Sequence, residues 1–197
     1  MLRNSFTATT MRRDEYQAKF GFALFIASLT MFFLASLAAY GIIRSTSGAP
    51  AISLGSFPLS LIASTISMFG VSFAMHKAVA NVRRERQVPF RRWLIAAAII
   101  SVAFLVFQTM GLHALLDMHR AALEDGVTKQ YGLMFFLVLV HALHVVGGIT
   151  FLSGVLVRAR HDAYDHEKHW GVDICALYWH FLDVVWIVML ATFLLGR

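Results

Sequence analysis

Five long apolar runs divide the chain, and short polar segments separate them. Each run reaches the roughly 20 residues that an α-helix needs to cross a hydrocarbon core of about 30 Å. Only helices and closed barrels satisfy their backbone hydrogen bonds inside a bilayer, so the pattern predicts an all-α, polytopic bundle of five transmembrane helices. The predicted spans are 18–43, 57–79, 93–116, 131–157 and 174–195.

The polar segments define the rest of the organisation. Residues 1–17 are polar and mixed in charge, which indicates a short N-terminal tail ahead of a membrane domain over 18–197. The first apolar run is about twice as long as the core of a secretory signal peptide, so we expect a true span. A stretch rich in Gly, Ser and Pro over 45–56 suits a short exposed connection.

Composition agrees with a membrane protein. The chain is 58% hydrophobic and only 14% charged, whereas soluble domains are about 45–50% apolar and about 25% charged. Its net charge of +6 does not indicate nucleic acid as a partner. The basic residues lie in short clusters at the ends of the apolar runs, where anionic lipid and insertion polarity explain them.

The distribution of these basic residues predicts the orientation. Thirteen Lys and Arg lie in 1–19, 77–92 and 158–168, and the remaining four lie toward the opposite ends of the spans. Connections rich in Lys and Arg stay in the cytoplasm. We therefore expect a cytoplasmic N-terminus and an external C-terminus, in agreement with an odd number of spans.

The last apolar run contains a histidine and a carboxylate, within the stretch YWHFLDVVW over 178–186. A charged side chain at the centre of a membrane helix costs roughly 2.5 to 3.5 kcal/mol on insertion scales, so such residues face other protein segments. His180 and Asp183 share one helix face, and Trp179 and Trp186 share a neighbouring one. Asp183 is either part of a proton relay or the partner of an imidazole or indole N–H that locks this helix in place.

Two histidines share one face of the fourth span. His141 and His144 can ligate a metal, donate to a lipid phosphate or bond to a neighbouring helix. A haem needs its axial imidazoles on opposite sides of the ring, so this pair cannot supply both. A cytochrome b site would recruit a histidine from another span, the candidates being His76, His113 and His180.

Smaller polar side chains mark the second and third spans. Ser60, Ser64 and Ser67 recur at helical spacing, which favours close helix packing and hydroxyl hydrogen bonds. Gln108 lies in the middle of the third span. Cys175 is the single cysteine, so it forms no intrachain disulfide, and we interpret it as a packing residue.

Two charged connections hold further candidates. The last connection combines His161, His166 and His169 with Asp162, Asp165 and Glu167, but their spacing matches no closed zinc motif, so we favour a solvated loop. The connection between the second and third spans is basic, which indicates either an anchor at anionic headgroups or a docking surface for another subunit. Its arginines are Arg83, Arg84, Arg86, Arg91 and Arg92.

Three stretches resemble subunit III of the haem-copper respiratory oxidases. YWHFLDVVW over 178–186 and HALHVVGG over 141–148 are similar to the family patterns W-H-F-x-D-V-V-W and H-x-x-H-V-x-x-G, in the same order. LFIASLTMFFLASLAAY over 24–40 is similar to the family's corresponding helix, as are Gln108 in FLVFQ and the region after Pro58. The resemblance covers nearly all of the membrane domain.

The resemblance implies a five-helix form that lacks the two additional N-terminal helices of longer members. It implies a non-catalytic subunit, without haem or copper of its own, that packs on oxidase subunit I in a hetero-oligomer that also contains subunit II. It further implies bound phospholipid, support of proton uptake and turnover stability, and a place in the bacterial inner membrane. Residues expected to lock helices or bind lipid are Gln108, His141, His144, Trp179, His180, Asp183 and Trp186.

The chain departs from the family where an acidic residue usually follows the F-I-x-S stretch, because Leu29 occupies that position. Gly111 and Leu112 occupy the region of a second family carboxylate. An accessory subunit of a nitric-oxide-reductase system and a haem-binding membrane anchor are the alternative functions. A small transporter is disfavoured, because the sequence shows neither repeated halves nor interrupted spans. Motifs of an independent enzyme are absent from the sequence.

Overall fold

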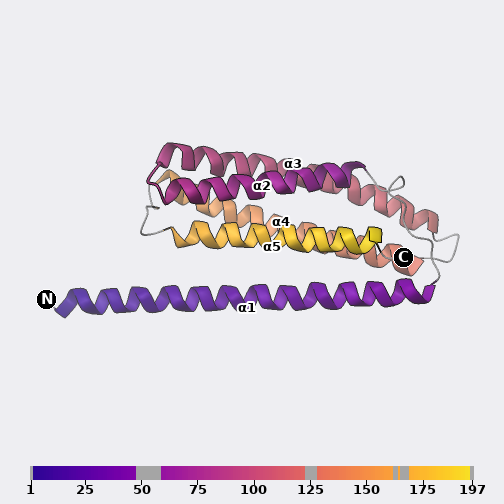
Figure 1. Cartoon of the computed structure of the whole chain (residues 1–197), viewed down its shortest axis with the longest axis horizontal. Coiled ribbons are helices and arrows are strands. Elements are labelled where there is room, and N and C mark those ends of the chain that lie inside the picture. The colour runs from indigo at the N-terminus through magenta and orange to yellow at the C-terminus, as the bar shows by residue number, and fades with distance from the viewer. Residues whose placement is uncertain (1, 48–58, 123–127, 162–163, 165–168, 196–197) are drawn as a thin grey trace.

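A computed structural model of the chain describes residues 2–47, 59–122, 128–161, 164 and 169–195. Within these residues the secondary structure is helical and contains no strand, which confirms the predicted all-α fold (Figure 1). The helices are α1 (Leu2–Ser47), α2 (Leu59–Val82), α3 (Gln87–Ala122), α4 (Thr128–Arg160) and α5 (Trp170–Leu195).

Each of the five helices contains a segment long and apolar enough to cross a membrane. The protein is therefore a multi-pass membrane protein, as the hydropathy pattern predicts. α1 begins at Leu2, so the backbone of the segment predicted as a polar tail is helical, and this end of α1 continues past the other helices (Figure 1). Hydropathy marks only the lipid-spanning part of a helix, whereas the backbone hydrogen bonds continue into the interface.

α2 and α3 form the most extensive helix pair. Their buried positions recur at alternating spacings of three and four residues, which places them on one stripe of each helix, as in a coiled coil. On α2 these positions are Leu61, Ser64, Met68, Val71, Met75, Ala78 and Val82. On α3 they are Phe90, Leu94, Ala97, Ser101, Phe104, Gln108 and Leu115. Gly111 continues the α3 stripe, and a Cβ there would lie 2.6 Å from Cγ of Leu61, so the glycine leaves room for that leucine.

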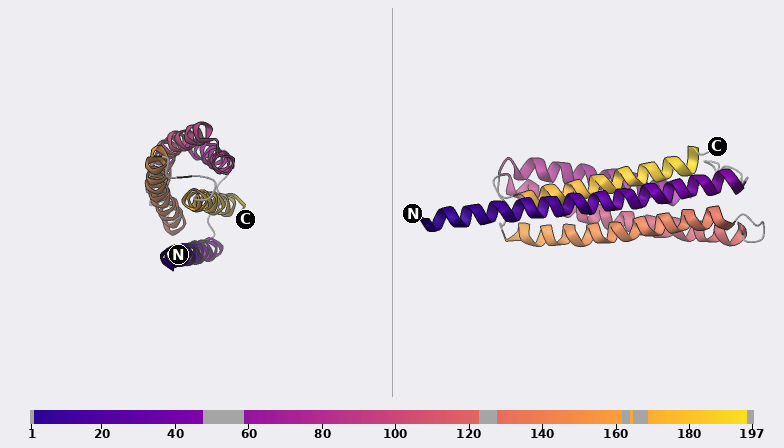
Figure 2. Two further views of the ribbon diagram at one scale, coloured as in Figure 1. Left: turned by 90° about the vertical axis from the view of Figure 1, so that its left-hand side faces the viewer. Right: turned by 90° about the horizontal axis from the view of Figure 1, so that it is seen from below.

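α5 is the central helix of the bundle. Half of the residues in its most apolar segment are buried, against 6% for α1, and α5 packs against α2, α4 and α1. An end-on view shows α2, α3 and α4 in an arc, with α5 on the concave side of that arc and α1 at its open end (Figure 2). α5, which carries His180 and Asp183 in its apolar run, is thus the helix that protein surrounds on most sides.

α1 docks on α4 and α5 through its C-terminal half. Among its described side chains, counted from Tyr16 onward, the first buried residue is Phe33, followed by Leu37 and Tyr40 on the same face. Arg44 completes this stripe and donates from Nη1 to the backbone oxygen of Phe193 over 3.0 Å and to the Tyr40 hydroxyl over 3.3 Å. The described α1 side chains before Phe33 are exposed or half-buried, and a cleft lies between this part of α1 and α5.

Candidate functional site

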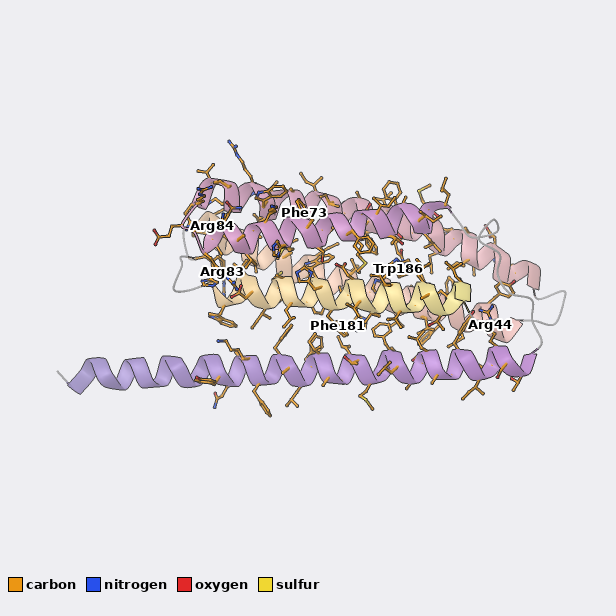
Figure 3. All side chains as sticks on the ribbon, viewed as in Figure 1. Arg44, Phe73, Arg83, Arg84, Phe181 and Trp186 are labelled. Carbon is orange, nitrogen blue, oxygen red and sulfur yellow. The ribbon has the colours of Figure 1, made fainter. Side chains whose placement is uncertain are left out.

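The polar face of α5 lies against α2. The indole N–H of Trp186 donates to the hydroxyl of Thr65 over 2.8 Å, and Nδ1 of His180 lies 2.6 Å from the hydroxyl of Ser72 (Figure 3 labels Trp186 between the two helices). Thr65 in turn donates to the backbone oxygen of Leu61 over 2.7 Å. Two side-chain hydrogen bonds, about two helical turns apart, therefore join α2 to α5.

Asp183 lies one turn beyond His180 and is 8% exposed. The Ser72 hydroxyl lies close enough to the carboxyl group to interact with it, while Oδ1 has no hydrogen-bond partner among the described residues. The Ser72 hydroxyl thus connects the imidazole and the carboxylate that share one face of α5. Sequence reasoning missed both Ser72 and Thr65. Their spacing of seven residues places them on one face of α2, and that spacing was the available signal.

His141 occupies an aromatic enclosure inside the bundle. Its ring is fully buried, stacks on Trp186 with 5.1 Å between ring centroids, and meets the edges of Phe33 at 6.4 Å and Phe104 at 6.3 Å. Neither ring nitrogen has a hydrogen-bond partner in the part of the chain that the structure describes. The imidazole therefore contributes packing here, and a contact with lipid stays a prediction.

His144 lies one turn further along α4 and is half-buried. Its Nδ1 lies 2.8 Å from the backbone oxygen of Val140, within the same helix. The hydroxyl of Tyr178 donates to the backbone oxygen of His144 over 2.8 Å, which ties α5 to α4. Close approach of the two helices follows from Gly148, where a Cβ would lie 3.1 Å from Cε1 of Tyr178 and 3.3 Å from Cζ2 of Trp179.

Two further residues predicted to lock helices are buried without a strong hydrogen bond. Trp179 packs against Gly148, and its Nε1 has no hydrogen-bond partner among the described residues. Neither amide atom of Gln108 has a partner within the same residues. Helix locking by Trp179 rests on packing, and a hydrogen-bonding role for Gln108 stays a prediction.

A cleft of about 750 Å³ separates the N-terminal half of α1 from α5. Its walls are mostly apolar, and Phe181 projects from α5 toward α1 at its side (Figure 3). Lys19 and Asp173 bring opposite charges to its lining, and His180 lies deeper along α5. Charged groups beside apolar walls suit an amphiphile, and the cleft gives water a route to the His180 ring.

A second cleft, of about 680 Å³, lies between α4 and the start of α5. Gly147 and Gly154 contribute no side chain to its α4 wall, and Arg158 and Tyr164 bring polar groups to its lining. Burial raises the pKa of the Tyr164 phenol, although the nearby Arg158 guanidinium acts in the opposite direction. The phenol is protonated at neutral pH, as an ordinary tyrosine is, so both groups can donate to an anionic headgroup.

The basic end of the bundle holds the predicted headgroup contacts. Arg83, Arg84, Arg86 and Arg92 are exposed and Arg91 is half-buried, at the end where α2 meets α3 (Figure 3 labels the first two). Nη2 of Arg83 lies 3.0 Å from Oδ1 of Asp173, and Nε2 of His169 lies 3.4 Å from Oδ2 of the same residue. The start of α5 is thereby tied to the connection between α2 and α3.

The structure groups no three His, Cys, Asp or Glu side chains in a way that would suit a metal ion, within the residues it describes. Of the histidines and carboxylates predicted for the last connection, only His161 and His169 are among the described residues. The others predicted for this loop lie outside them, namely Asp162, Asp165, His166 and Glu167. The solvated-loop interpretation of this segment stays a prediction.

Comparison with known proteins supplies a family. Residues 5–195 match the family described as "Cytochrome c oxidase subunit III". A cytochrome c oxidase subunit 3 from Synechocystis sp. is 33% identical over 179 residues, which cover 86% of this chain and 72% of that protein. Subunits from Thermostichus vulcanus and Chondrus crispus are each 28% identical, over 64% and 87% of this chain. The chain spans 60% and 64% of the lengths of these two relatives.

Proposed function

The chain belongs to the cytochrome c oxidase subunit III family, and from this we propose that it is a non-catalytic membrane subunit of a haem-copper terminal oxidase in aerobic respiration. The family match over nearly the whole chain is the observation that carries the proposal. The resemblance of the last two predicted spans to oxidase subunit III is confirmed by this match. The relatives are components of an oxidoreductase complex, and we assign this chain to the same kind of hetero-oligomer, with subunits I and II as partners.

Haem and copper belong to the partner subunit in this proposal. His141 does not fit a haem, because Phe33, Phe104 and Trp186 surround its ring at centroid distances of 5.1 to 6.4 Å. A porphyrin cannot approach an imidazole enclosed in this way. This packing argues against a haem-binding anchor that uses His141.

Bound phospholipid is the second part of the proposal. The two clefts are apolar along their walls and carry cationic groups, Lys19 in one and Arg158 in the other. Acyl chains gain free energy from apolar contact, and charge-assisted hydrogen bonds hold phosphate oxygens. We place the more defined headgroup contact at Arg158, next to the protonated Tyr164 phenol.

The proposed setting is the bacterial inner membrane, with the N-terminus in the cytoplasm. The start of α1, the α2–α3 connection, the end of α4 and the start of α5 lie at one end of the bundle (Figure 1). These are the segments richest in Lys and Arg, which supports a cytoplasmic location for that end. Support of proton uptake and turnover stability in the neighbouring catalytic subunit completes the proposed role.

Purification of the native complex through a tag on this chain tests the proposal. We expect a haem-bearing subunit to copurify, and we expect the Soret absorption to remain with that subunit when the chain is isolated. A Soret band from the isolated chain, or the absence of any haem-bearing companion, would overturn the proposal. Copurification with a nitric-oxide reductase instead of an oxidase would favour the accessory-subunit alternative.

The lipid contact is tested in the same preparation by mass spectrometry. Arg158→Gln should reduce the amount of copurifying anionic phospholipid, because the guanidinium supplies the positive charge of its cleft. Arg160→Gln is the matched control, since Arg160 is exposed on the same helix and does not line either cleft. Equal lipid content in the two variants would contradict the assignment of Arg158.

A further inference from the structure

Three side chains on α2 and α5 form a continuous line of polar contacts from the α1–α5 cleft into the bundle. His180 lines the cleft and places Nδ1 2.6 Å from Oγ of Ser72. The Ser72 hydroxyl also lies close enough to the Asp183 carboxyl to interact with it. A carboxylate inside a membrane helix is costly, so its presence next to an imidazole and a hydroxyl calls for a reason beyond packing.

The chemistry of the three groups suits proton transfer. A serine hydroxyl donates one hydrogen bond and accepts others at the same time, so it can bridge an acid and a base. When both nitrogens of His180 are protonated, Nδ1–H donates to Ser72 and the Ser72 O–H donates to the Asp183 carboxylate. The Nδ1 proton then passes to the Ser72 oxygen while the original Ser72 proton passes to Asp183. The result is a neutral imidazole, an intact hydroxyl and a protonated carboxyl group, so protons and charge balance.

We propose that His180, Ser72 and Asp183 form a proton relay that connects the α1–α5 cleft to a proton-holding site on Asp183. The inference deepens the proposed support of proton uptake, and its place in the oxidase rests on that proposed function. Binding of a proton by Asp183, in contrast, does not depend on a partner subunit.

The surroundings give the relay one polar end and one dry end. At the polar end, Lys19 and Asp173 line the same cleft as His180, and His76 on α2 lies close enough to interact electrostatically with His180. Asp173 is paired with Arg83 and His169. These are the charged and titratable groups that face the relay from α1, α2, α5 and the α2–α3 connection.

The dry end is a hollow next to Asp183 on the outer side of α2 and α5. It has no room for a water molecule, and Thr65 is the only polar residue besides Asp183 in its lining. The Thr65 hydroxyl is already engaged by Trp186 and Leu61. The described polar contacts of Asp183 therefore lead back through Ser72 and His180.

Infrared spectroscopy of the full chain in lipid nanodiscs tests the proton-holding site. We expect a pH-dependent C=O stretch of a protonated carboxyl group that disappears in Asp183→Asn. The band should persist in Asp173→Asn, which removes a carboxylate from the cleft but not from the relay. If the band persists in Asp183→Asn, or never forms in the parent chain, the inference is overturned.

The transfer step is tested by following the same band after a pH jump. Ser72→Ala should slow its appearance at least about tenfold, since positioned proton-transfer groups contribute about 10²- to 10⁴-fold in rate. Ser72→Thr keeps a hydroxyl and should restore the rate, and Ser67→Ala should have no effect because Ser67 bonds its own helix at Ala63. His180→Gln should slow the step as Ser72→Ala does, which covers the case in which Ser72→Ala fails to fold.

A rate in Ser72→Ala or His180→Gln equal to that of the parent chain would overturn the relay. These measurements need no partner subunit. A chain that shows the relay but copurifies with no oxidase would refute the proposed function alone, whereas a chain that copurifies with an oxidase but lacks the band would refute the relay alone.

Discussion

Trp186 and Thr65 are 121 positions apart in the sequence, and the indole N–H of the first donates to the hydroxyl of the second over 2.8 Å. The same indole also stacks on the His141 ring, with 5.1 Å between the ring centroids. One side chain of α5 therefore contacts both α2 and α4. A residue that joins three helices through a hydrogen bond and a ring stack is well suited to fix the position of the central helix.

Trp186→Phe should lower the free energy of unfolding by about 1 kcal/mol, because it keeps an aromatic ring but removes the N–H donor to Thr65. Trp179→Phe is the matched control, since the Trp179 Nε1 has no hydrogen-bond partner among the described residues. We expect a smaller loss for this control. Thermal unfolding of both variants in one detergent provides the measurement, and equal losses would contradict a specific role for the Trp186 hydrogen bond.

Arg44→Met should loosen the attachment of α1 to α5. Arg44 is 9% exposed and donates to the Phe193 backbone oxygen, and hydrogen bonds to charged groups contribute about 1.5 to 3 kcal/mol. Faster amide exchange in the C-terminal half of α1 is the expected result. Arg120→Met is the control, because the Arg120–Asp117 pair is exposed at 67% and 74% and should contribute little. Unchanged exchange in Arg44→Met would exclude this anchoring contact.

Gly148→Ala should destabilise the α4–α5 contact. The added Cβ would lie 3.1 Å from Cε1 of Tyr178 and 3.3 Å from Cζ2 of Trp179, two buried side chains with little freedom to move. Overpacking of this kind costs typically about 1 to 3 kcal/mol. Gly154→Ala, on the same helix, meets no atom within 4 Å and should be neutral or slightly stabilising. A comparison of the two melting temperatures checks the prediction, and a higher value for Gly148→Ala would refute it.

Much of this fold was predictable from the sequence because a bilayer permits few alternatives. Five apolar runs of spanning length imply five helices, and the polar pair His180 and Asp183 implies that α5 faces protein. The identity of the facing helix was not predictable. Ser72 and Thr65 lie in α2, far away in the sequence, and hydroxyls in a membrane helix usually bond their own backbone, as Ser67 does.

The clefts and the surroundings of His141 could not be predicted from the sequence either. Hydropathy marks α1 as a span but does not report that the buried residues among its described side chains begin at Phe33. The spacing of His141 and His144 indicates a shared face, yet one ring is enclosed by aromatic groups while the other bonds within its own helix. Such differences depend on which neighbouring side chains fill the space, and periodicity within one helix does not contain that information.

Gln108 offers a direct test of the sequence prediction that this amide locks helices. Both of its amide atoms are buried and lack a partner among the described residues, and a buried polar group without a hydrogen bond costs about 1 to 3 kcal/mol. Gln108→Met keeps the length and shape of the side chain and removes the polar atoms. We therefore expect the free energy of unfolding to stay unchanged or to rise.

Gln87→Met is the matched control for this change. Nε2 of Gln87 donates to the backbone oxygen of Tyr164 over 2.9 Å, so the same substitution removes a hydrogen bond there and should cost about 1 kcal/mol. Unfolding of both variants is measured for the isolated chain in one detergent. If Gln108→Met is destabilised as much as Gln87→Met, the Gln108 amide has a partner, such as a buried water molecule, and the helix-locking role predicted from the sequence is correct.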